Sequence, residues 1–345
     1  MIIELIVIPK SPIPDLNATP PFVLNTNYWI IDKFADGTPL PANAFVGSMI
    51  GGSMDSERGY PNDGGYYQDD VIYAGYVKKP AGGTNWNKGG VIRITINKDP
   101  VMANWKNPAT WVASSVIGDQ DDIGPVTTSI ARLQDNKNGN LWLYFGTGRF
   151  YWRNTSALDD YSDTQSLYGI KEPCYNNTAV PGAHINPNCT DSIASSQLVP
   201  QTTADLFGNF SAVGASNAGW RIDLAGSTST QGAERVITDT TALTNGTVFF
   251  TSFKPTTDFC GYGGNSFLWA VKYDTGGNAA SNALQGKALI QLSTGEFKEI
   301  TLQDVFSGGS RSTSAGAGKP PTDPISIVTS SNNRPVKKIL HIREH

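Results

Sequence analysis

The sequence predicts an all-β protein, a partial β-propeller with four-stranded antiparallel blades and long loop insertions. The first observation is a pair of adjacent strand patterns that recurs three times along the 345 residues, and internal repetition is the signature of repeat architectures. The second is the composition: 36 glycines and 21 prolines accompany only 16% charged residues, so turn formers are abundant and helix-favouring Lys, Glu and Arg are scarce. The third is the lack of any amphipathic helical pattern longer than two turns.

Each of the three copies predicts a β-hairpin. A β-branched and aromatic run is followed, after a loop of variable length, by a shorter apolar strand that begins with Gly, Asn or Ser. In a propeller such sheets stack radially and bury both faces, which explains continuous apolar strands without covering helices. A generic β-sandwich is the alternative. The predicted hairpins pair residues 71–77 with 90–96, 140–146 with 166–170, and 247–253 with 266–272.

Further strand patterns flank the hairpins and would complete the blades. Residues 125–133 precede the second hairpin and 234–238 precede the third. Residues 111–117 follow the first, and 288–292 are expected to be the fourth strand of the third blade. Two closing strands are predicted at 325–328 and 336–342.

The chain divides into residues 1–60, an N-terminal extension with the first strands, and residues 61–345, the propeller-like domain. Residues 172–218 are rich in Asn, Thr, Ser and Ala and predict an elaborated surface loop, and the Gly- and Ser-rich residues 307–324 predict a flexible loop. The sequence supplies three to five blades. Because closed propellers need more, and the start lacks a basic segment and cleavage site, we expect an export signal and further sequence outside this chain.

Two of the three cysteines predict a disulfide. Cys174 and Cys189 bracket a polar loop without core-forming residues, and no cysteine pair has the spacing of a zinc or thioredoxin-like site. A bridge there would stabilise the fold by roughly 3 kcal/mol on the chain-entropy estimate. The alternative is free thiols in a cytosolic protein, with Cys260 an ordinary buried side chain.

Charge and hydropathy exclude two classes of partner. A net charge of -4 provides no basic field for nucleic acid. No run approaches the roughly 18 apolar residues that span a bilayer, so we expect no membrane span.

Several motifs resemble the C-terminal propeller-like domain of the PilY-type biogenesis factors and tip adhesins of bacterial type IV pili. The resemblance covers roughly residues 65 to 290, and its most specific part combines the Tyr-Phe-Gly-Thr-Gly-Arg run of residues 144–149 with Leu-Tyr-Gly-Ile at 167–170. The motifs that carry it are at residues 70–75, 123–128, 143–150, 165–170, 219–224, 234–239, 248–251 and 260–271.

This resemblance implies a non-catalytic binding module that acts in pilus assembly, adhesion and twitching motility. It implies a location at the cell surface, on the pilus tip or the outer membrane. The implied partners are minor pilins or other tip components, with a host or surface ligand in addition.

The resemblance also indicates a candidate calcium site. Some family members hold calcium in an acidic loop before the strand that matches residues 71–75. Here the corresponding loop, residues 62–70, places only Asp63 and Asp69 near the required positions, whereas calcium takes six to eight oxygen ligands. A solvated acidic turn is the alternative, and no other cofactor is expected.

Two other functions remain as alternatives. One is a quinone-dependent dehydrogenase, because quinoproteins are also propellers; many of those enzymes carry a vicinal Cys-Cys pair, which this chain lacks. The other is a carbohydrate-binding surface protein, because aromatic residues in loops can stack on sugars or anchor a protein partner. The candidate aromatics are Tyr60, Tyr66, Tyr67, Trp86, Trp105, Tyr151 and Trp152.

Overall fold

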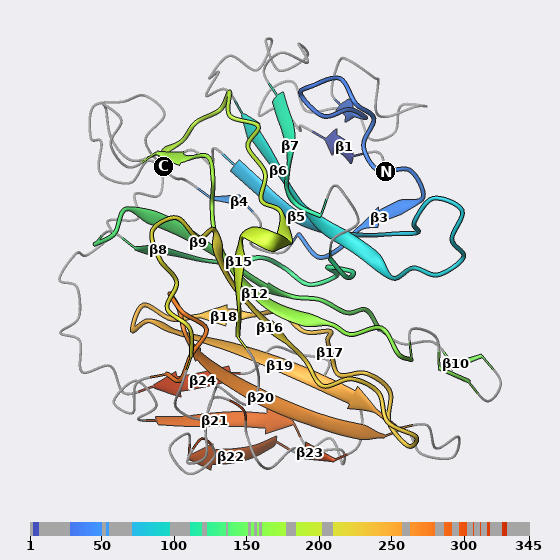
Figure 1. The fold of residues 1–345 in the computed structure, drawn as a ribbon, viewed down its shortest axis with the longest axis vertical. Coiled ribbons are helices and arrows are strands. Elements are labelled where there is room, and N and C mark those ends of the chain that lie inside the picture. Colours follow the sequence, from blue (N-terminus) through green and yellow to red (C-terminus); the bar gives the residue numbers. More distant parts are fainter. Residues whose placement is uncertain are drawn as a thin grey trace, which may run out of the picture.

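The computed structural model shows a series of β-sheets that follow one another in chain order (Figure 1). Among the described residues, no helix is long and apolar enough to cross a membrane. The structure describes residues 3–6, 28–49, 53–54, 71–96, 111–118, 123–135, 137–150, 153–154, 157–158, 161–176, 184–201, 210–256, 263–279, 286–291, 297–301, 306, 311, 316–317 and 326–329.

The first sheet contains the first predicted hairpin. β5 pairs with β6, with Tyr73 opposite Arg93, and β6 pairs with β7, as predicted for residues 111–117. β7 is therefore the outermost strand on one side, and β3 and β4 both pair with β5 on the other. The strands are β3 (Ala44–Val46), β4 (Ser53–Met54), β5 (Val71–Lys78), β6 (Lys88–Ile96) and β7 (Trp111–Ile117).

The second sheet contains the second predicted hairpin, with β9 paired to β12. β8 precedes it and pairs with β9, and β16 extends the sheet beyond β12. β15 adds a parallel edge strand beside β16. Since β15 comes from the segment 172–218, the prediction of a surface loop there was wrong in part: the segment completes a sheet. The strands are β8 (Ala131–Asp135), β9 (Asn140–Gly146), β12 (Ser166–Lys171), β15 (Leu198–Gln201) and β16 (Gly219–Asp223).

The third sheet contains the third predicted hairpin, but its outer strand differs from the prediction. β19 pairs with β20, and β20 pairs on its other side with β23 from the Gly-rich segment 307–324. A segment predicted to be a flexible loop therefore contributes a strand, because its backbone groups can complete the edge of β20. The strands are β17 (Arg235–Val236), β18 (Thr241–Ala242), β19 (Thr247–Pro255), β20 (Gly264–Lys272) and β23 (Gly316–Ala317).

A fourth sheet takes the strand that was predicted for the third blade. β21 (Gly286–Gln291) pairs with β22 (Phe297–Thr301) and with β24 (Ser326–Thr329). β24 confirms one predicted closing strand; the other, 336–342, lies outside the described residues. The remaining elements are the pairs β1 (Ile3–Ile6) with β2 (Tyr28–Ile31), β10 (Arg153–Asn154) with β11 (Ala157–Leu158), β13 (Tyr175–Asn176) with β14 (His184–Ile185), and the 3-10 turn η3 (Ser195–Gln197).

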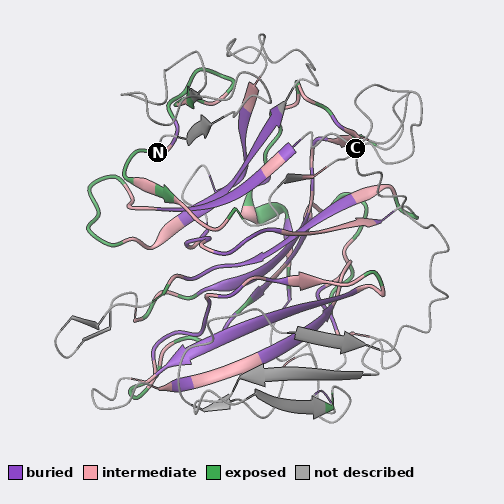
Figure 2. Cartoon of the chain, turned by 180° about the vertical axis from the view of Figure 1, so that it is seen from behind, coloured by how far each residue is buried: buried purple, intermediate pink, exposed green. Residues whose placement is uncertain are grey.

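The second sheet is buried on both faces, as a propeller-like blade requires. Along β9, Leu143 and Phe145 pack with residues of the first sheet, whereas Trp142 and Tyr144 pack with residues of the third. This alternation follows from the two-residue period of a strand. Figure 2 shows the central strands of the first three sheets largely buried. The fold is therefore all-β and propeller-like.

The same glycine–valine contact recurs at both boundaries of the second sheet. A Cβ on Gly75 of β5 would lie 2.5 Å from Val126 Cγ1, and one on Gly146 of β9 would lie 2.4 Å from Val236 Cγ2. Each valine comes before the hairpin of the next sheet along the chain. Its backbone amide donates a hydrogen bond to the preceding sheet: Val126 N donates to Tyr76 O (3.1 Å) and Val236 N to Thr147 O (3.0 Å). Glycine is needed here because any side chain would separate adjacent sheets.

Candidate binding surface

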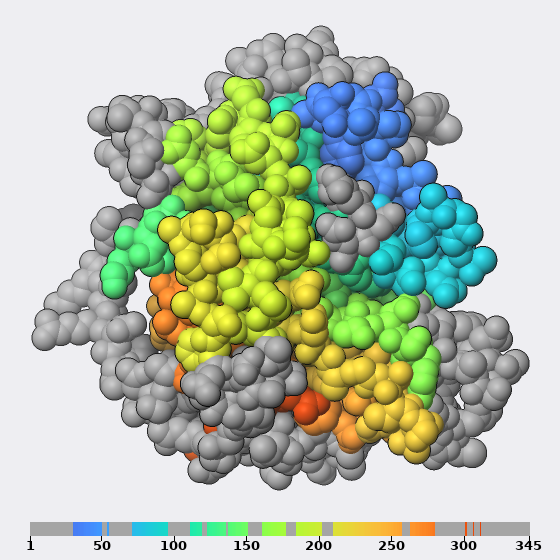
Figure 3. All heavy atoms as spheres, viewed as in Figure 1, coloured from blue at the N-terminus to red at the C-terminus, as the bar shows by residue number. Residues whose placement is uncertain are grey.

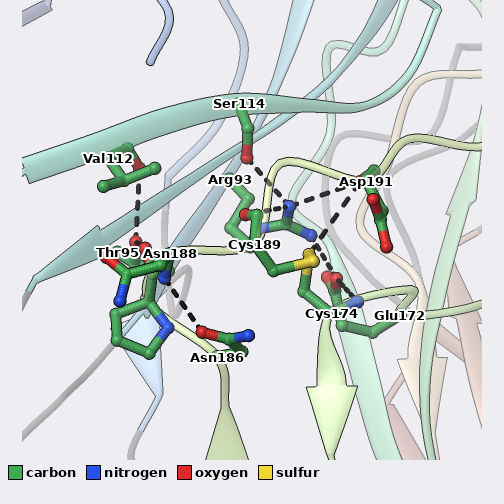
Figure 4. The surroundings of a disulfide bond; sticks show 11 residues. Arg93, Thr95, Val112, Ser114, Glu172, Cys174, Asn186, Asn188, Cys189 and Asp191 are labelled. Atoms are coloured by element: carbon green, nitrogen blue, oxygen red, sulfur yellow. Dashed lines mark hydrogen bonds and ion pairs between the residues drawn. A yellow bond between two sulfur atoms is a disulfide. The ribbon is translucent and has the colours of Figure 1, made fainter. Parts of the chain in front are cut away.

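A buried arginine lies at the boundary between the first and second sheets, which we call the first seam. Arg93 of β6 is fully buried and forms an ion pair with Glu172, the residue after β12. Its Nη2 atom also donates to Ser114 Oγ (2.9 Å) and to the carbonyl oxygens of Cys189 (3.2 Å) and Asp191 (3.3 Å). Figure 4 shows the guanidinium group surrounded by these four partners, which come from β7, from the end of β12 and from the segment that contains Cys189 and Asp191.

Glu172 connects this arginine to the cysteine loop. Its Oε1 atom accepts a hydrogen bond from Cys174 N (2.9 Å) as well as the ion pair. Two charges removed from water need such compensation, because each desolvated ion otherwise costs several kcal/mol. Burial, reinforced by the negative charge of Glu172, raises the pKa of Tyr73 well above its usual value.

The predicted disulfide between Cys174 and Cys189 is confirmed, with the two Cα atoms 5.6 Å apart. Cys174 is 3% exposed and packs in the core between the first two sheets. Beyond the bridge, Ile193 N donates to Val116 O (2.8 Å), and Ile193 forms an isolated parallel bridge with Ile117. Residues 184–197, which include Cys189, are therefore held against β7 at Ile193; we call them the insert.

A groove opens where the insert meets the N-terminal segment 31–41. On that side, Ala35 N donates to Ala113 O of β7 (2.8 Å). The groove has a volume of about 490 Å³ and is lined by residues of the N-terminal segment, of β7 and of the insert, together with Lys78. In Figure 3, teal residues of β7 lie between the blue N-terminal segment and the yellow-green insert.

Trp86 is the one predicted surface aromatic within the described residues, and it packs against Phe45 and Lys79, away from the groove lining. Its ring stacks on Phe45 at 4.2 Å between centroids, and Lys79 Nζ lies 4.7 Å from its centroid. Phe45 is 53% exposed. The other predicted aromatics, Tyr60, Tyr66, Tyr67, Trp105, Tyr151 and Trp152, lie outside the described residues.

The predicted calcium ligands cannot be placed. Asp63 and Asp69 lie outside the described residues. Within the described part of the chain, no group of three or more His, Cys, Asp or Glu side chains could hold a metal ion. Calcium binding stays a prediction from the resemblance.

A second buried carboxylate supports the third sheet. Glu234 is fully buried and accepts hydrogen bonds from Ser252 and from Trp269 Nε1 (3.2 Å), and Arg311 Nη2 lies 2.7 Å from its Oε2 atom. Arg311 also lies over the ring of Phe267, 3.4 Å from the centroid. The network therefore ties Arg311 to β20.

Sequence reasoning missed Arg93, Glu172 and the groove. A signal for Arg93 was present: it interrupts the apolar run 91–96, and a charge inside a strand buried on both faces needs a partner. The groove had no such signal, because its lining comes from segments that are far apart in the sequence.

No protein-family model matches the sequence, and no curated protein matches it. Among solved structures, the chain is similar to the C-terminal domain of PilY1 from Pseudomonas aeruginosa, with 16% sequence identity and a TM-score of 0.42. The match covers 73% of this chain and 58% of the PilY1 domain, so this chain spans less than two thirds of the length of that domain. The comparison is a distant, fold-level match to the family that the motifs resemble.

Proposed function

We propose that this chain is an exported, non-catalytic binding module of a type IV pilus apparatus, acting in pilus assembly and adhesion. The observation that carries the proposal is the disulfide-closed insert docked on the edge of the first sheet. Structural disulfides form and persist mainly in oxidising compartments outside the cytosol. The sequence motifs supply the link to pili, with minor pilins or tip components as partners.

The architecture suits binding because the insert is held on a packed β scaffold. Binding residues are often found on loops that a packed framework positions. Here the insert is anchored by Cys189, which is bonded to Cys174 in the core, and by Ile193, on β7. The anchoring reduces the conformational entropy that a partner would otherwise have to remove on binding.

Deletion of the gene in its source organism tests this role. We expect fewer surface pili, smaller twitching zones and weaker attachment, all restored by the wild-type gene. Complementation with Cys174→Ser/Cys189→Ser should restore these traits only in part, because the insert loses its covalent anchor. Normal piliation, twitching and attachment after deletion would contradict the proposal, as would dye reduction by the purified chain supplied with pyrroloquinoline quinone and calcium.

We also propose weak calcium binding by the loop that contains Asp63 and Asp69. Calcium titration calorimetry on the wild type should give heat that is lost in Asp63→Asn/Asp69→Asn. Absence of heat and of any thermal stabilisation by calcium would remove the site.

A further inference from the structure

The groove over β7 has a lining suited to a ligand that is rich in hydroxyl groups. Its polar side chains are mostly hydroxyls, with one carboxylate and one ammonium group, and its apolar side is formed by an aromatic ring and two prolines. We propose that it binds a neutral sugar unit of a glycan. The residues that carry the argument are Phe34, Asp36, Thr38, Ser115, Thr190 and Ser192.

Ser115 supplies a buried hydroxyl that the protein leaves unused. It is 8% exposed and lines the groove, yet its Oγ atom has no hydrogen-bond partner among the described residues. A buried polar group without a partner costs about 1–3 kcal/mol. Because a hydroxyl both donates and accepts, a sugar hydroxyl in the groove would remove that cost.

Asp36 supplies a carboxylate that is already oriented. Its Oδ1 atom accepts hydrogen bonds from Thr38 N (2.8 Å) and Thr38 Oγ1 (2.6 Å). The side-chain hydrogen bond from Thr38, with its backbone one, lowers the pKa of Asp36, so the group stays ionised in mildly acidic medium. An ionised carboxylate accepts strong hydrogen bonds from sugar hydroxyls.

The apolar side and the size of the groove also fit. Phe34 is partly buried against the outer face of the first sheet, and it lines the groove together with Pro39 and Pro41. Such a surface can pack against the C–H face of a sugar ring. The volume of about 490 Å³ lies within the range of roughly 300–1,000 Å³ typical of small-molecule sites.

An extended peptide fits less well, although β7 is the outermost strand of its sheet. A peptide that adds to a sheet edge needs a run of free backbone groups. Here Ala35 N binds Ala113 O on one side and Ile193 N binds Val116 O on the other. Only Ser114 and Ser115 lie between these contacts, which is too short for an added strand.

The experiment measures sugar binding by the purified full chain. A glycan array finds the preferred terminal sugar, and calorimetric titration with that free monosaccharide, chosen among glucose, galactose, mannose and N-acetylglucosamine, gives the affinity. We expect Asp36→Asn to weaken binding about tenfold and Ser115→Ala about fivefold, as one charged and one neutral hydrogen bond predict. The matched controls are Asp32→Asn and Ser196→Ala, both exposed and outside the groove lining; they should bind like the wild type.

The outcomes separate this inference from the pilus role, which it deepens and on which it rests for its biological setting. Binding weakened in Asp36→Asn and retained in both controls supports the sugar site. It does so even if gene deletion leaves piliation normal, a result that would contradict only the pilus role. The sugar site is overturned if no neutral glycan binds at millimolar concentration, if both groove variants bind normally, or if an extended peptide is captured in the groove instead. Since Asp36 is exposed, its variant tests the site even if Ser115→Ala fails to fold.

Discussion

The first seam contains the buried Arg93–Glu172 ion pair and the disulfide, whereas the boundary between the second and third sheets, the second seam, is filled mostly by aromatic and aliphatic side chains. In the second seam, Trp220 lies 6.2 Å from Tyr144 and 6.3 Å from Phe250 between ring centroids. Its Nε1 atom donates to Tyr273 O (3.0 Å). In the first seam, the fully buried Arg93 and Glu172 form an ion pair.

Both seams share the glycine–valine contact, so the ion pair and the disulfide of the first seam are additional to a packing arrangement that the two seams have in common. The shared contact sets the distance between sheets and needs no polar group. The Arg93–Glu172 ion pair and the disulfide lie where the insert meets the first seam, whereas Glu234 and Arg311 form an ion pair beside Trp269 in the second. We infer that the first seam is polar because it holds the insert that forms the groove.

The largest effect is expected when the ion pair of the first seam loses one partner. Glu172→Gln leaves the buried Arg93 without its counter-charge, which should reduce the free energy of unfolding by about 3–5 kcal/mol. Arg93→Met/Glu172→Leu should recover most of this loss, because no unpaired charge remains. The measurement is urea unfolding, with Asp223→Asn at the partly exposed Arg221–Asp223 pair as a control expected to stay within about 1 kcal/mol. Equal losses in Glu172→Gln and the control would contradict the assignment.

Removal of the disulfide should have the next largest effect. The half-cystines are 15 residues apart in the sequence, and closing a loop of this length stabilises a fold by about 3 kcal/mol. Cys174→Ser/Cys189→Ser should therefore lower the midpoint of urea unfolding. A variant as stable as the wild type would show that the first seam holds the insert without the bond.

The glycine contacts test what the two seams have in common. Gly75→Ala and Gly146→Ala should each destabilise by about 1–3 kcal/mol through overpacking. At Gly146 the three nearest atoms all belong to the Val236 side chain, whereas at Gly75 one of them is the Val126 carbonyl oxygen. Double-mutant cycles with Val236→Ala and Val126→Ala should therefore show stronger rescue at the second seam.

Gly226 provides the control for these variants, because a Cβ there would meet nothing within 4 Å. Gly226→Ala should change stability by less than about 1 kcal/mol. Equal rescue at both seams would contradict the distinction between side-chain and backbone contacts.

The smallest expected effect is on how steeply stability falls at alkaline pH, through a tyrosine beside the second seam. Burial and the nearby Asp135 carboxylate raise the pKa of Tyr273 to about 12. A raised folded-state pKa gives stability that is complete below the unfolded value near 10 and is lost as the pH rises towards 12. Unfolding free energies measured across that window should fall less steeply in Tyr273→Phe than in the wild type. An unchanged slope would contradict the shift.

Local patterns in the sequence predicted strands well but predicted their partners less well. The runs at 71–77, 140–146 and 247–253 formed the predicted hairpins because both strands of each are apolar and close in sequence. The pattern at 288–292 also formed a strand, but in the fourth sheet, because strand patterning does not specify which edge is free.

The candidate site was less predictable for a related reason. The spacing of Cys174 and Cys189 was sufficient to predict the disulfide. The groove instead joins Phe34, Ser115 and Thr190, which only the packing of three segments brings together. Gly316 and Ala317 form β23 although their composition favours a loop, because the edge of β20 provides the hydrogen bonds.

Amide hydrogen exchange compares the two seams most directly. Ile193 N reports the insert on β7 through its bond to Val116 O, and Val236 N reports the second seam through its bond to Thr147 O. In Cys174→Ser/Cys189→Ser, we predict a larger increase in exchange rate at Ile193 than at Val236, because the loss of global stability acts on both amides and the lost anchor acts on Ile193 alone. Equal acceleration at both amides, or none at Ile193, would contradict the conclusion that the covalent link of the first seam holds the insert in place.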